Sequence, residues 1–187
     1  MRGKGFTLVE LAIVLVIIGL ILGAILKGQE IINNAKMKRL YNQYREVVAA
    51  VYTYYDRYGA FPGDDPNASS RWSSTKNGDG DGWIEGFNIN CAAGADSESC
   101  RAWEHMRLAN ILTGNGTIAP KNPYGGGVGI GYNTVQGLTT NWIGFDNVPG
   151  DVCESIDTQY DDGFYNTGSI RASGNYTSNY VDLYIRL

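Results

Sequence analysis

The hydrophobic pattern is strongest near the N-terminus, where residues 6–26 are almost entirely apolar and Glu10 is the single formal charge. An apolar run of about 20 residues, at ~1.5 Å per residue in a helix, is long enough to cross a bilayer core of ~30 Å. An ionised carboxylate at membrane depth costs roughly 2.5–3.5 kcal/mol or more, so Glu10 is expected to have a partner or a task. Because Arg2 and Lys4 precede the run, we expect the residues after it to lie outside the cytoplasm.

The alternative for this segment is a removable secretory signal peptide. Such a peptide has an apolar core of about 7–15 residues before a cleavage site of small residues. Here the run is longer, and Ala24 and Gly28 lie within a pattern that continues as a helix. The sequence therefore favours a helix that remains part of the protein.

The predicted helix continues to about Tyr58, because no proline or dense cluster of turn residues interrupts the chain before that point. After Lys27 the pattern becomes amphipathic, and bulky residues recur at spacings of three and four, which places them on one helical face. Gly59 and Pro62 are expected to end the helix, since glycine favours a helix C-terminus and proline cannot continue it. The face that we expect to pack against a globular domain comprises Tyr41, Tyr44, Val48, Val51, Tyr55 and Tyr58.

The rest of the chain has shorter patterns. Residues 61–90 are rich in Gly, Asp, Ser and Asn and are expected to form a loop. Residues 100–112 predict a short helix that buries Trp103, Met106, Ile111 and Leu112. Runs typical of β-strands follow at residues 128–132, 141–145, 169–172 and 180–185. The predicted fold is α+β, with the long N-terminal helix packed on a small antiparallel sheet with irregular loops.

Composition and the absence of catalytic motifs narrow the function classes. Lys and Arg number 15 and Asp and Glu number 19 among 187 residues, a formal net charge of −4. This acidic balance argues against general nucleic-acid binding. The sequence contains no GxSxG, HExxH, P-loop or dinucleotide-binding pattern, and His105, the single histidine, has no accompanying nucleophile motif. We therefore expect a protein that is not an enzyme and a structural role for His105.

A candidate metal loop begins at Asn77. Oxygen-bearing side chains occupy loop positions 1, 3 and 5, which are Asn77, Asp79 and Asp81, and position 6 is a glycine. Position 7 would contribute the main-chain carbonyl of Trp83. This pattern is typical of the first half of a calcium loop of the helix–loop–helix kind.

The second half of that loop, which would span residues 77–88, departs from the calcium pattern. Position 12 is Asn88 rather than the bidentate glutamate that closes such a site. The closing ligand must therefore come from elsewhere, and the candidates are Glu85, Asp64 and Asp65. The alternative is an acidic, glycine-rich turn that holds no ion.

A second acidic segment near the C-terminus matches no metal-loop spacing and is expected to be a solvated turn. It contains Asp157, Asp161, Asp162 and Gly163.

The three cysteines, Cys91, Cys100 and Cys153, fit an oxidising compartment, with one disulfide and one remaining thiol. Cys91 and Cys100 enclose a small polar loop, so this pair is the favoured disulfide. The spacing leaves the pairs Cys100–Cys153 and Cys91–Cys153 open. Zinc and thioredoxin-like chemistry have little support, because the sequence lacks a CxxC pair.

The segment Gly5-Phe6-Thr7-Leu8-Val9-Glu10, behind a short basic leader, resembles the type IV pilin signature. The matching parts are a glycine before the cleavage point, a phenylalanine after it, the nearby glutamate and the uninterrupted apolar sequence that follows. The resemblance covers about residues 1–60, and the C-terminal part only in outline. In place of the proline that many pilins have near the middle of this helix, the chain has Gly19, Gly23 and Gly28.

The resemblance implies that a prepilin peptidase cuts between Gly5 and Phe6 and methylates the new amine of Phe6. It also implies a ladle-shaped subunit whose helix lies at the core of a helical filament. In a staggered filament the Glu10 carboxylate of one copy can meet the Phe6 amine of another, so that each charge relieves the cost of the other. Phe6 and Glu10 are therefore the expected assembly residues.

The expected organisation has four parts. Residues 1–5 are a leader that is removed, residues 6–28 are the transmembrane and filament-core helix, residues 29–58 continue it as an amphipathic helix, and residues 59–187 form a globular head. The subunit is expected in the bacterial inner membrane before assembly and in a cell-surface pilus afterwards. Its expected partners are further copies of itself, prepilin peptidase and the pilus or secretion assembly machinery.

The function implied by the resemblance is that of a structural subunit of a type IV pilus. One alternative is a pseudopilin of a type II secretion system or a minor pilin. Another is a membrane-anchored, calcium-dependent binding module that does not polymerise.

Overall fold

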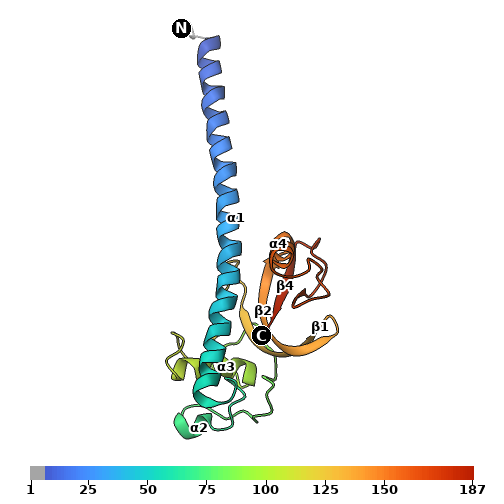
Figure 1. The fold of residues 1–187 in the computed structure, drawn as a ribbon. Helices are drawn as coiled ribbons and strands as arrows, with labels where there is room; N and C mark the ends of the chain where they lie inside the picture. The colour runs from blue at the N-terminus through green and yellow to red at the C-terminus, as the bar shows by residue number, and fades with distance from the viewer. Residues whose placement is uncertain (1–6) are drawn as a thin grey trace. The chain divides into compact units, whose positions relative to one another are not determined.

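The structure, a computed structural model, describes residues 7–187, so the predicted processing residues Gly5 and Phe6 lie outside the described part. The elements in chain order are α1 (Leu8–Tyr58), α2 (Ala68–Arg71), α3 (Glu98–Leu108), β1 (Val128–Val135), β2 (Leu138–Pro149), α4 (Gly150–Tyr160), β3 (Ile170–Ala172) and β4 (Tyr180–Arg186) (Figure 1). The chain forms two compact units, of which the first ends at Lys38 and the second comprises Arg39–Leu187.

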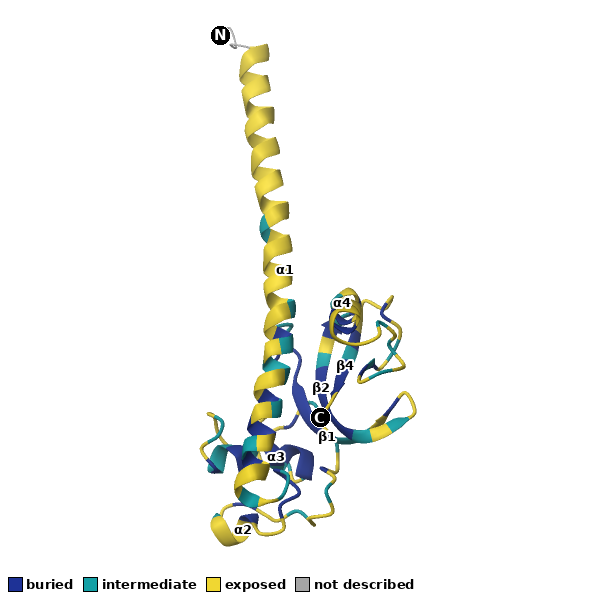
Figure 2. Cartoon of the chain, in the orientation of Figure 1, coloured by how far each residue is buried: buried dark blue, intermediate teal, exposed yellow. Residues whose placement is uncertain are grey.

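The first unit contains the N-terminal part of α1. Large aliphatic side chains between Leu8 and Leu26 are 47–86% exposed, and this part of the helix is coloured as exposed in Figure 2. Among residues 7–187, α1 is the one helix that is long and apolar enough to cross a membrane, as judged by length and composition alone. The predicted N-terminal apolar helix is therefore present.

A four-stranded antiparallel sheet in the order β1-β2-β4-β3 lies in the second unit. Helix α4 packs against β2, β3 and β4 (Figure 1), and α3 contacts β1. A long N-terminal helix with a small antiparallel sheet is the α+β fold that the sequence predicted, and this prediction is confirmed.

Strands β1 and β2 form a hairpin that is longer than the predicted strands. They pair up to Val135 and Leu138, so only Gln136 and Gly137 form the turn. Both turn residues have positive φ, 47° and 80°, a combination whose twist matches that of the paired strands. The predicted strands were too short because the residues near the turn are polar and do not alternate with apolar ones. Backbone hydrogen bonds form there all the same, because they do not depend on the side chain.

Burial within α1 begins at Leu40, and the buried face differs from the predicted one. Of the predicted residues, Val51 is buried, but Tyr55 is 41% exposed and the other four are half-buried. The predicted face does contact the head, since Tyr41 stacks on Tyr160 and the Tyr44 hydroxyl donates to the Arg186 carbonyl at 3.0 Å, but its tyrosines are not the most buried positions, because the polar end of tyrosine favours partial exposure. The residues of α1 that are buried are Leu40, Val47, Ala50, Val51 and Tyr54.

Helix α3 begins two residues earlier than predicted and ends at Leu108. Its start is capped by the Ser97 side chain, which accepts a hydrogen bond from the Cys100 backbone N–H at 3.3 Å. Trp103 and Met106 are buried on this helix, as predicted. The prediction was wrong for Ile111 and Leu112, which lie beyond the end of the helix and are half-buried.

Helix α4 was not predicted. Its buried residues are Gly150, Cys153, Ile156 and Asp157, of which only Ile156 is a large aliphatic residue. A buried face with so little apolar character does not produce a helical pattern in the sequence.

Buried side chains in the second unit come from most of its elements, and Val135, Trp142 and Tyr184 form one cluster among them. The largest fully buried side chains come from α1, α3, α4, the sheet and the loop before α3, so the C-terminal part of α1 belongs to the head. They are Trp103, Trp142, Tyr54, Phe145, Leu40, Ile84, Met106, Ile130, Ile143, Ile156, Leu183 and His105.

Candidate functional site

At the N-terminus of α1, Glu10 contacts Thr7. The backbone N–H and the hydroxyl of Thr7 donate to the Glu10 carboxylate at 2.7 and 2.8 Å, and the Glu10 N–H donates to Thr7 Oγ1 at 3.3 Å. This reciprocal pattern is a capping box, in which a threonine and a glutamate three residues later satisfy N–H groups that the helix leaves unpaired. The sequence analysis missed this role, although the Thr-x-x-Glu spacing was visible.

The capping box does not test the predicted pairing of Glu10 with Phe6 of another copy, since Phe6 lies outside the described residues. Glu10 is exposed in the single chain. Its two oxygens offer about four lone-pair sites, so Glu10 can cap its own helix and also accept a hydrogen bond from a neighbouring amine. The pairing stays a prediction.

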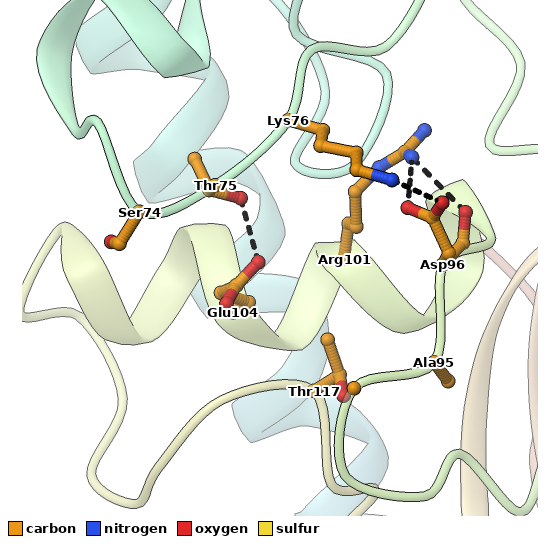
Figure 3. Close-up of a pocket in the computed structure, with 9 residues that line it drawn as sticks. Ser74, Thr75, Lys76, Ala95, Asp96, Arg101, Glu104 and Thr117 are labelled. Carbon is orange, nitrogen blue, oxygen red and sulfur yellow. Dashed lines mark hydrogen bonds and ion pairs between the residues drawn. The ribbon is translucent and has the colours of Figure 1, made fainter.

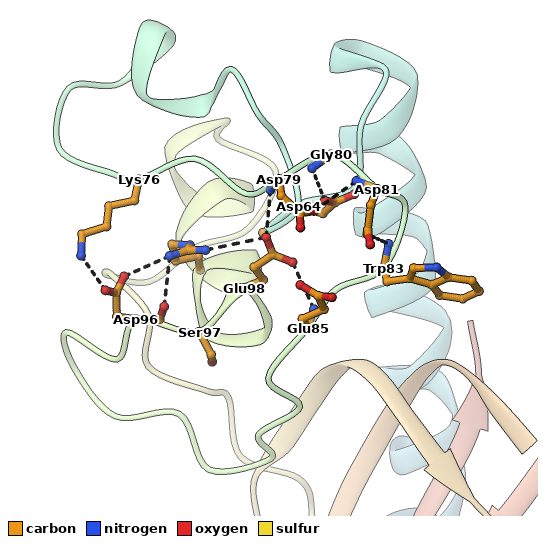
Figure 4. Close-up of polar contacts among 12 residues, drawn as sticks. Asp64, Lys76, Asp79, Gly80, Asp81, Trp83, Glu85, Asp96, Ser97 and Glu98 are labelled. Atoms are coloured by element: carbon orange, nitrogen blue, oxygen red, sulfur yellow. Dashed lines mark hydrogen bonds and ion pairs between the residues drawn. The ribbon is translucent and has the colours of Figure 1, made fainter. Parts of the chain in front are cut away.

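Five carboxylates converge in the head, and we call them the carboxylate site: Asp64, Asp79, Asp81, Glu85 and Glu98. Oxygens of Asp64, Asp79 and Glu98 lie within 4.8 Å of one another, and the same holds for Asp79, Asp81 and Glu85. Asp64 comes from the loop after α1, the next three from the following acidic loop, and Glu98 from the first turn of α3 (Figure 4). The site can therefore join three segments of the chain.

Backbone N–H groups hold the two buried carboxylates. Asp64 accepts hydrogen bonds from the N–H groups of Gly80 and Gly82 at 2.6 and 2.9 Å. Glu98 accepts from those of Asp79 and Glu85, both at 3.1 Å. The acidic loop is thus wrapped around these two side chains.

The loop also approaches the backbone of Asp64 closely at Gly78. A Cβ atom at this position would lie 2.3 Å from the Cα of Asp64, so only glycine fits.

Burial raises the pKa values of Asp64 and Glu98, and the charge of Asp79 adds to the shift of each. Among residues 7–187, the one cation within ion-pair distance of the carboxylate site is Arg101, 3.8 Å from Glu98. The site consequently carries excess negative charge that a bound cation would offset. Acidic clusters of this kind can hold a metal ion.

The structure brings Asp64, Asp79, Asp81 and Glu85 together, but it places two other predicted ligands elsewhere. Asn77 Oδ1 accepts a hydrogen bond from the Ser69 N–H at 2.8 Å. Asp65 pairs with Arg71 and accepts a hydrogen bond from the Tyr54 hydroxyl at 2.6 Å. The backbone N–H of Trp83 donates to Asp81 at 2.8 Å, and ligation by its carbonyl stays a prediction.

Glu98 is the member of the site that the sequence analysis missed. It lies 21 residues after Asn77 in the numbering, far outside the 12-residue calcium loop that guided the prediction. The available signal was Ser97, a favoured N-cap residue that marks a helix start directly before Glu98.

A separate polar cavity of about 230 Å³, lined by residues that include Ser74, Gly94 and Thr117, contains charges that are paired with one another (Figure 3). Asp96 lies 2.5 Å from Lys76 and 3.0 Å from Arg101, and Glu104 accepts a hydrogen bond from Thr75 at 2.6 Å. These pairings distinguish the cavity from the carboxylate site.

Cys91 and Cys100 form a disulfide, which confirms the favoured pairing. Cys100 lies in the first turn of α3, two residues after Glu98, so the bond also restrains the helix start that carries this carboxylate. Cys153 is a buried free thiol, and burial raises its pKa. A thiol in such surroundings stays protonated and is a poor nucleophile.

The second acidic segment is not the solvated turn that the sequence predicted. Asp157 lies in α4 and is fully buried, and it accepts hydrogen bonds from the Tyr176 hydroxyl at 2.6 Å and the Gly163 N–H at 3.2 Å. Asp161 and Asp162 are exposed, as expected. The prediction was wrong for Asp157 because helix α4, which carries it inward, was not recognised.

His105 is buried between two backbone segments. Its Nδ1 accepts a hydrogen bond from the Gly63 N–H at 2.9 Å, so Nε2 carries the proton and donates to the Lys76 carbonyl at 3.1 Å. Burial lowers the pKa of His105 to about 4, which keeps the ring neutral near pH 7. These contacts support the expected structural role.

The stabilising effect of His105, relative to a His105→Gln variant, should fall by about 2 kcal/mol between pH 7 and pH 5. The folded state favours the neutral ring, so this contribution is complete above the ordinary pKa of about 6.5 and is lost as the pH falls toward 4. Urea denaturation of the full chain in detergent at both pH values would measure it. Equal pH dependence in the wild type and the variant would contradict the prediction.

Comparison with known proteins adds one match. Residues 1–26 match the family model described as the prokaryotic N-terminal methylation motif. No curated protein and no solved structure matches the chain. The motif indicates a structural, non-enzymatic protein that is processed by a prepilin peptidase and assembled in a pilus or secretion system, and the apolar helix indicates membrane anchoring before assembly. The chain therefore has the N-terminal segment of a type IV pilin-family prepilin.

Proposed function

We propose that this protein is the structural subunit of a type IV pilus filament. The observation that carries the proposal is the methylation motif continued by a helix whose aliphatic side chains between Leu8 and Leu26 are 47–86% exposed. An apolar surface of this extent needs a cover, which lipid supplies in the membrane and other copies supply in a filament. Burial of these side chains between copies would provide most of the attraction.

Processing prepares the helix for assembly. Cleavage between Gly5 and Phe6 creates a positively charged amine at the edge of the apolar helix, and Glu10 supplies the opposite charge on a neighbouring copy. An unpaired charge in apolar surroundings is costly, so this pair favours one axial register over others. Residues 1–5 are the leader, residues 6–28 the membrane and filament-core helix, residues 29–58 its amphipathic continuation and residues 59–187 the extracytoplasmic head.

The abundance of the protein in material sheared from the cell surface tests the filament role. A major pilus subunit should dominate the sheared fraction as long filaments. A minor pilin or a type II secretion pseudopilin would be scarce there, and a membrane-anchored module that does not polymerise would be missing. Absence from the sheared fraction, with the protein abundant in the inner membrane, would contradict the proposal.

We also propose that the carboxylate site binds calcium. Calcium prefers six to eight oxygen ligands at about 2.3–2.6 Å, so oxygens on opposite sides of an ion lie up to about 5 Å apart. The spacing of up to 4.8 Å within the group of Asp64, Asp79 and Glu98 fits this geometry. Glu98 then provides the closing carboxylate that the loop itself lacks, and the ion would tie α3 to the loop after α1.

Calcium at about 100 times its dissociation constant should stabilise the full chain by roughly 3 kcal/mol and raise its melting temperature by about 5–10 °C. Glu98→Gln should remove most of this shift, because it takes one carboxylate charge from the site. Glu154→Gln is the matched control, since Glu154 is exposed on α4 and lies outside the carboxylate site. Thermal melts and isothermal titration in detergent measure both effects, and the absence of heat at millimolar calcium would contradict the proposal.

A further inference from the structure

A cavity of about 270 Å³ opens beside the carboxylate site, and its walls differ in chemistry. Two of its lining residues are aromatic, Tyr55 and Phe61, whose ring centroids lie 4.9 Å apart, and we call them the aromatic wall. Two others are acidic, Asp64 and Asp81, and we call them the acidic wall. The remaining lining residues are small or cyclic: Gly59, Ala60, Pro66, Gly80 and Gly82.

The charge on the acidic wall has no counterpart in the chain that is described. Among residues 7–187, no Lys, Arg or His lies within 4.0 Å of the carboxylate oxygens of Asp64 or Asp81. Asp64 is 2% exposed, and its carboxylate accepts hydrogen bonds from the backbone N–H groups of Gly80 and Gly82, whereas Asp81 is exposed. The cavity of Figure 3 differs, because its Lys76 and Arg101 already pair with Asp96.

We propose that this cavity binds the ammonium or guanidinium head of a lysine or arginine side chain from a second copy of the chain. The inference rests on the filament function proposed above. An organic cation can use both walls, because its charge can pair with the exposed carboxylate of Asp81 while its head or stem packs on the electron-rich faces of the rings. A calcium ion would use the carboxylates and gain nothing from Tyr55 and Phe61, so the two kinds of ligand can be told apart.

The chain carries the complementary charge in one segment of α1. Residues 36–45 contain four basic residues and no acidic one. Within this segment Arg39 is paired with Glu46 at 2.6 Å. Lys38 and Arg45 have exposed side chains and, among residues 7–187, no ion pair. They are the side chains that we expect to enter the cavity of a neighbouring copy.

Binding of N-acetyl-lysine methylamide to the full chain in detergent tests the cavity itself. N-acetyl-norleucine methylamide is the control probe, since it has a similar stem and no charge. We expect saturable binding of the lysine probe alone, weakened roughly three- to tenfold by Tyr55→Leu or Phe61→Leu, with the calcium-induced rise in melting temperature unchanged. Equal binding of the two probes, or no effect of either substitution, would overturn the proposal.

Charge reversal in filaments tests the second copy as the source of the cation. Asp81→Lys should reduce the sheared filaments at least about tenfold, and a second change, Lys38→Glu or Arg45→Glu, should restore them at least in part, because the reversed pair attracts again. Glu154→Lys controls for the change in net charge and should have little effect. Normal assembly of Asp81→Lys, or no restoration by either second change, would overturn this assignment.

The outcomes separate the two proposals. If the wild type forms filaments but the probe and the charge-reversed variants fail the tests above, the cavity assignment is wrong and the filament function stands. If the wild type forms no filaments while the lysine probe binds as expected, the filament function and the second copy as the source are wrong, and the cavity is a site for a free organic cation.

Discussion

Replacing Glu10 with glutamine is expected to leave the protein in the membrane and to reduce the filaments recovered by shearing at least tenfold. Glutamine can still accept the hydrogen bonds from Thr7 that cap α1, so the helix start is kept. It cannot neutralise the amine of Phe6 on another copy. Leaving one member of a buried charge pair without its partner costs about 3–5 kcal/mol, which is more than a hundredfold in an equilibrium constant.

Thr7→Ala is the matched control for this prediction. It removes the hydroxyl of the capping box, at a cost of about 0.5–2 kcal/mol to the helix, and keeps the charge of Glu10. Filament yield should therefore remain close to that of the wild type. Normal yield from Glu10→Gln would show that the charge of Glu10 is not needed for assembly. An equal loss from both variants would show that the loss does not come from the charge, because Thr7→Ala keeps it.

Asp65→Asn is expected to destabilise the head by about 3 kcal/mol. Asp65 is 1% exposed and forms an ion pair with Arg71. It also accepts hydrogen bonds from the Tyr54 hydroxyl at 2.6 Å and from the Asn67 N–H at 2.8 Å. It thereby fastens the end of α1 to the loop that follows. The asparagine has nearly the same shape but leaves Arg71, which is only 29% exposed, without its counter-charge.

Urea denaturation of the full chain in detergent, followed by the near-ultraviolet signal of its tryptophans, measures this loss. Tyr54→Phe is the comparison, because it removes one hydrogen bond to Asp65 and should cost only about 1 kcal/mol. If Asp65→Asn costs no more than Tyr54→Phe, the ion pair with Arg71 does not stabilise the head, and the prediction is wrong.

Features with a strong local signal could be predicted from the sequence. The apolar run before Leu26 identifies a helix by itself, and Gly59 with Pro62 marks its end close to Tyr58. The disulfide was predictable because its two cysteines enclose a short polar loop. The hairpin turn at Gln136–Gly137 was not predicted, because pairing through the backbone does not require a hydrophobic pattern. Helix α4 was not predicted, because its buried face is small and contains few apolar residues.

In the candidate site, too, residues with a local sequence signal were predicted and residues without one were missed. The acidic loop was visible because its carboxylates follow one another along the chain. Glu98 was missed because the folded chain, rather than local spacing, brings α3 to the loop. The tyrosine pattern in α1 identified a face that contacts the head but not its most buried residues, because spacing cannot tell a buried ring from one that is 41% exposed like Tyr55. That exposure is what makes the aromatic wall of the proposed cation cavity available.

The intact mass of the protein recovered from the sheared cell-surface fraction tests the central claim most directly. A processed pilus subunit should lack residues 1–5 and carry one additional methyl group, which fragmentation should place on the amine of Phe6. A surface protein that keeps residues 1–5, or one that begins after the apolar run, as removal of a secretory signal peptide would produce, would contradict the account.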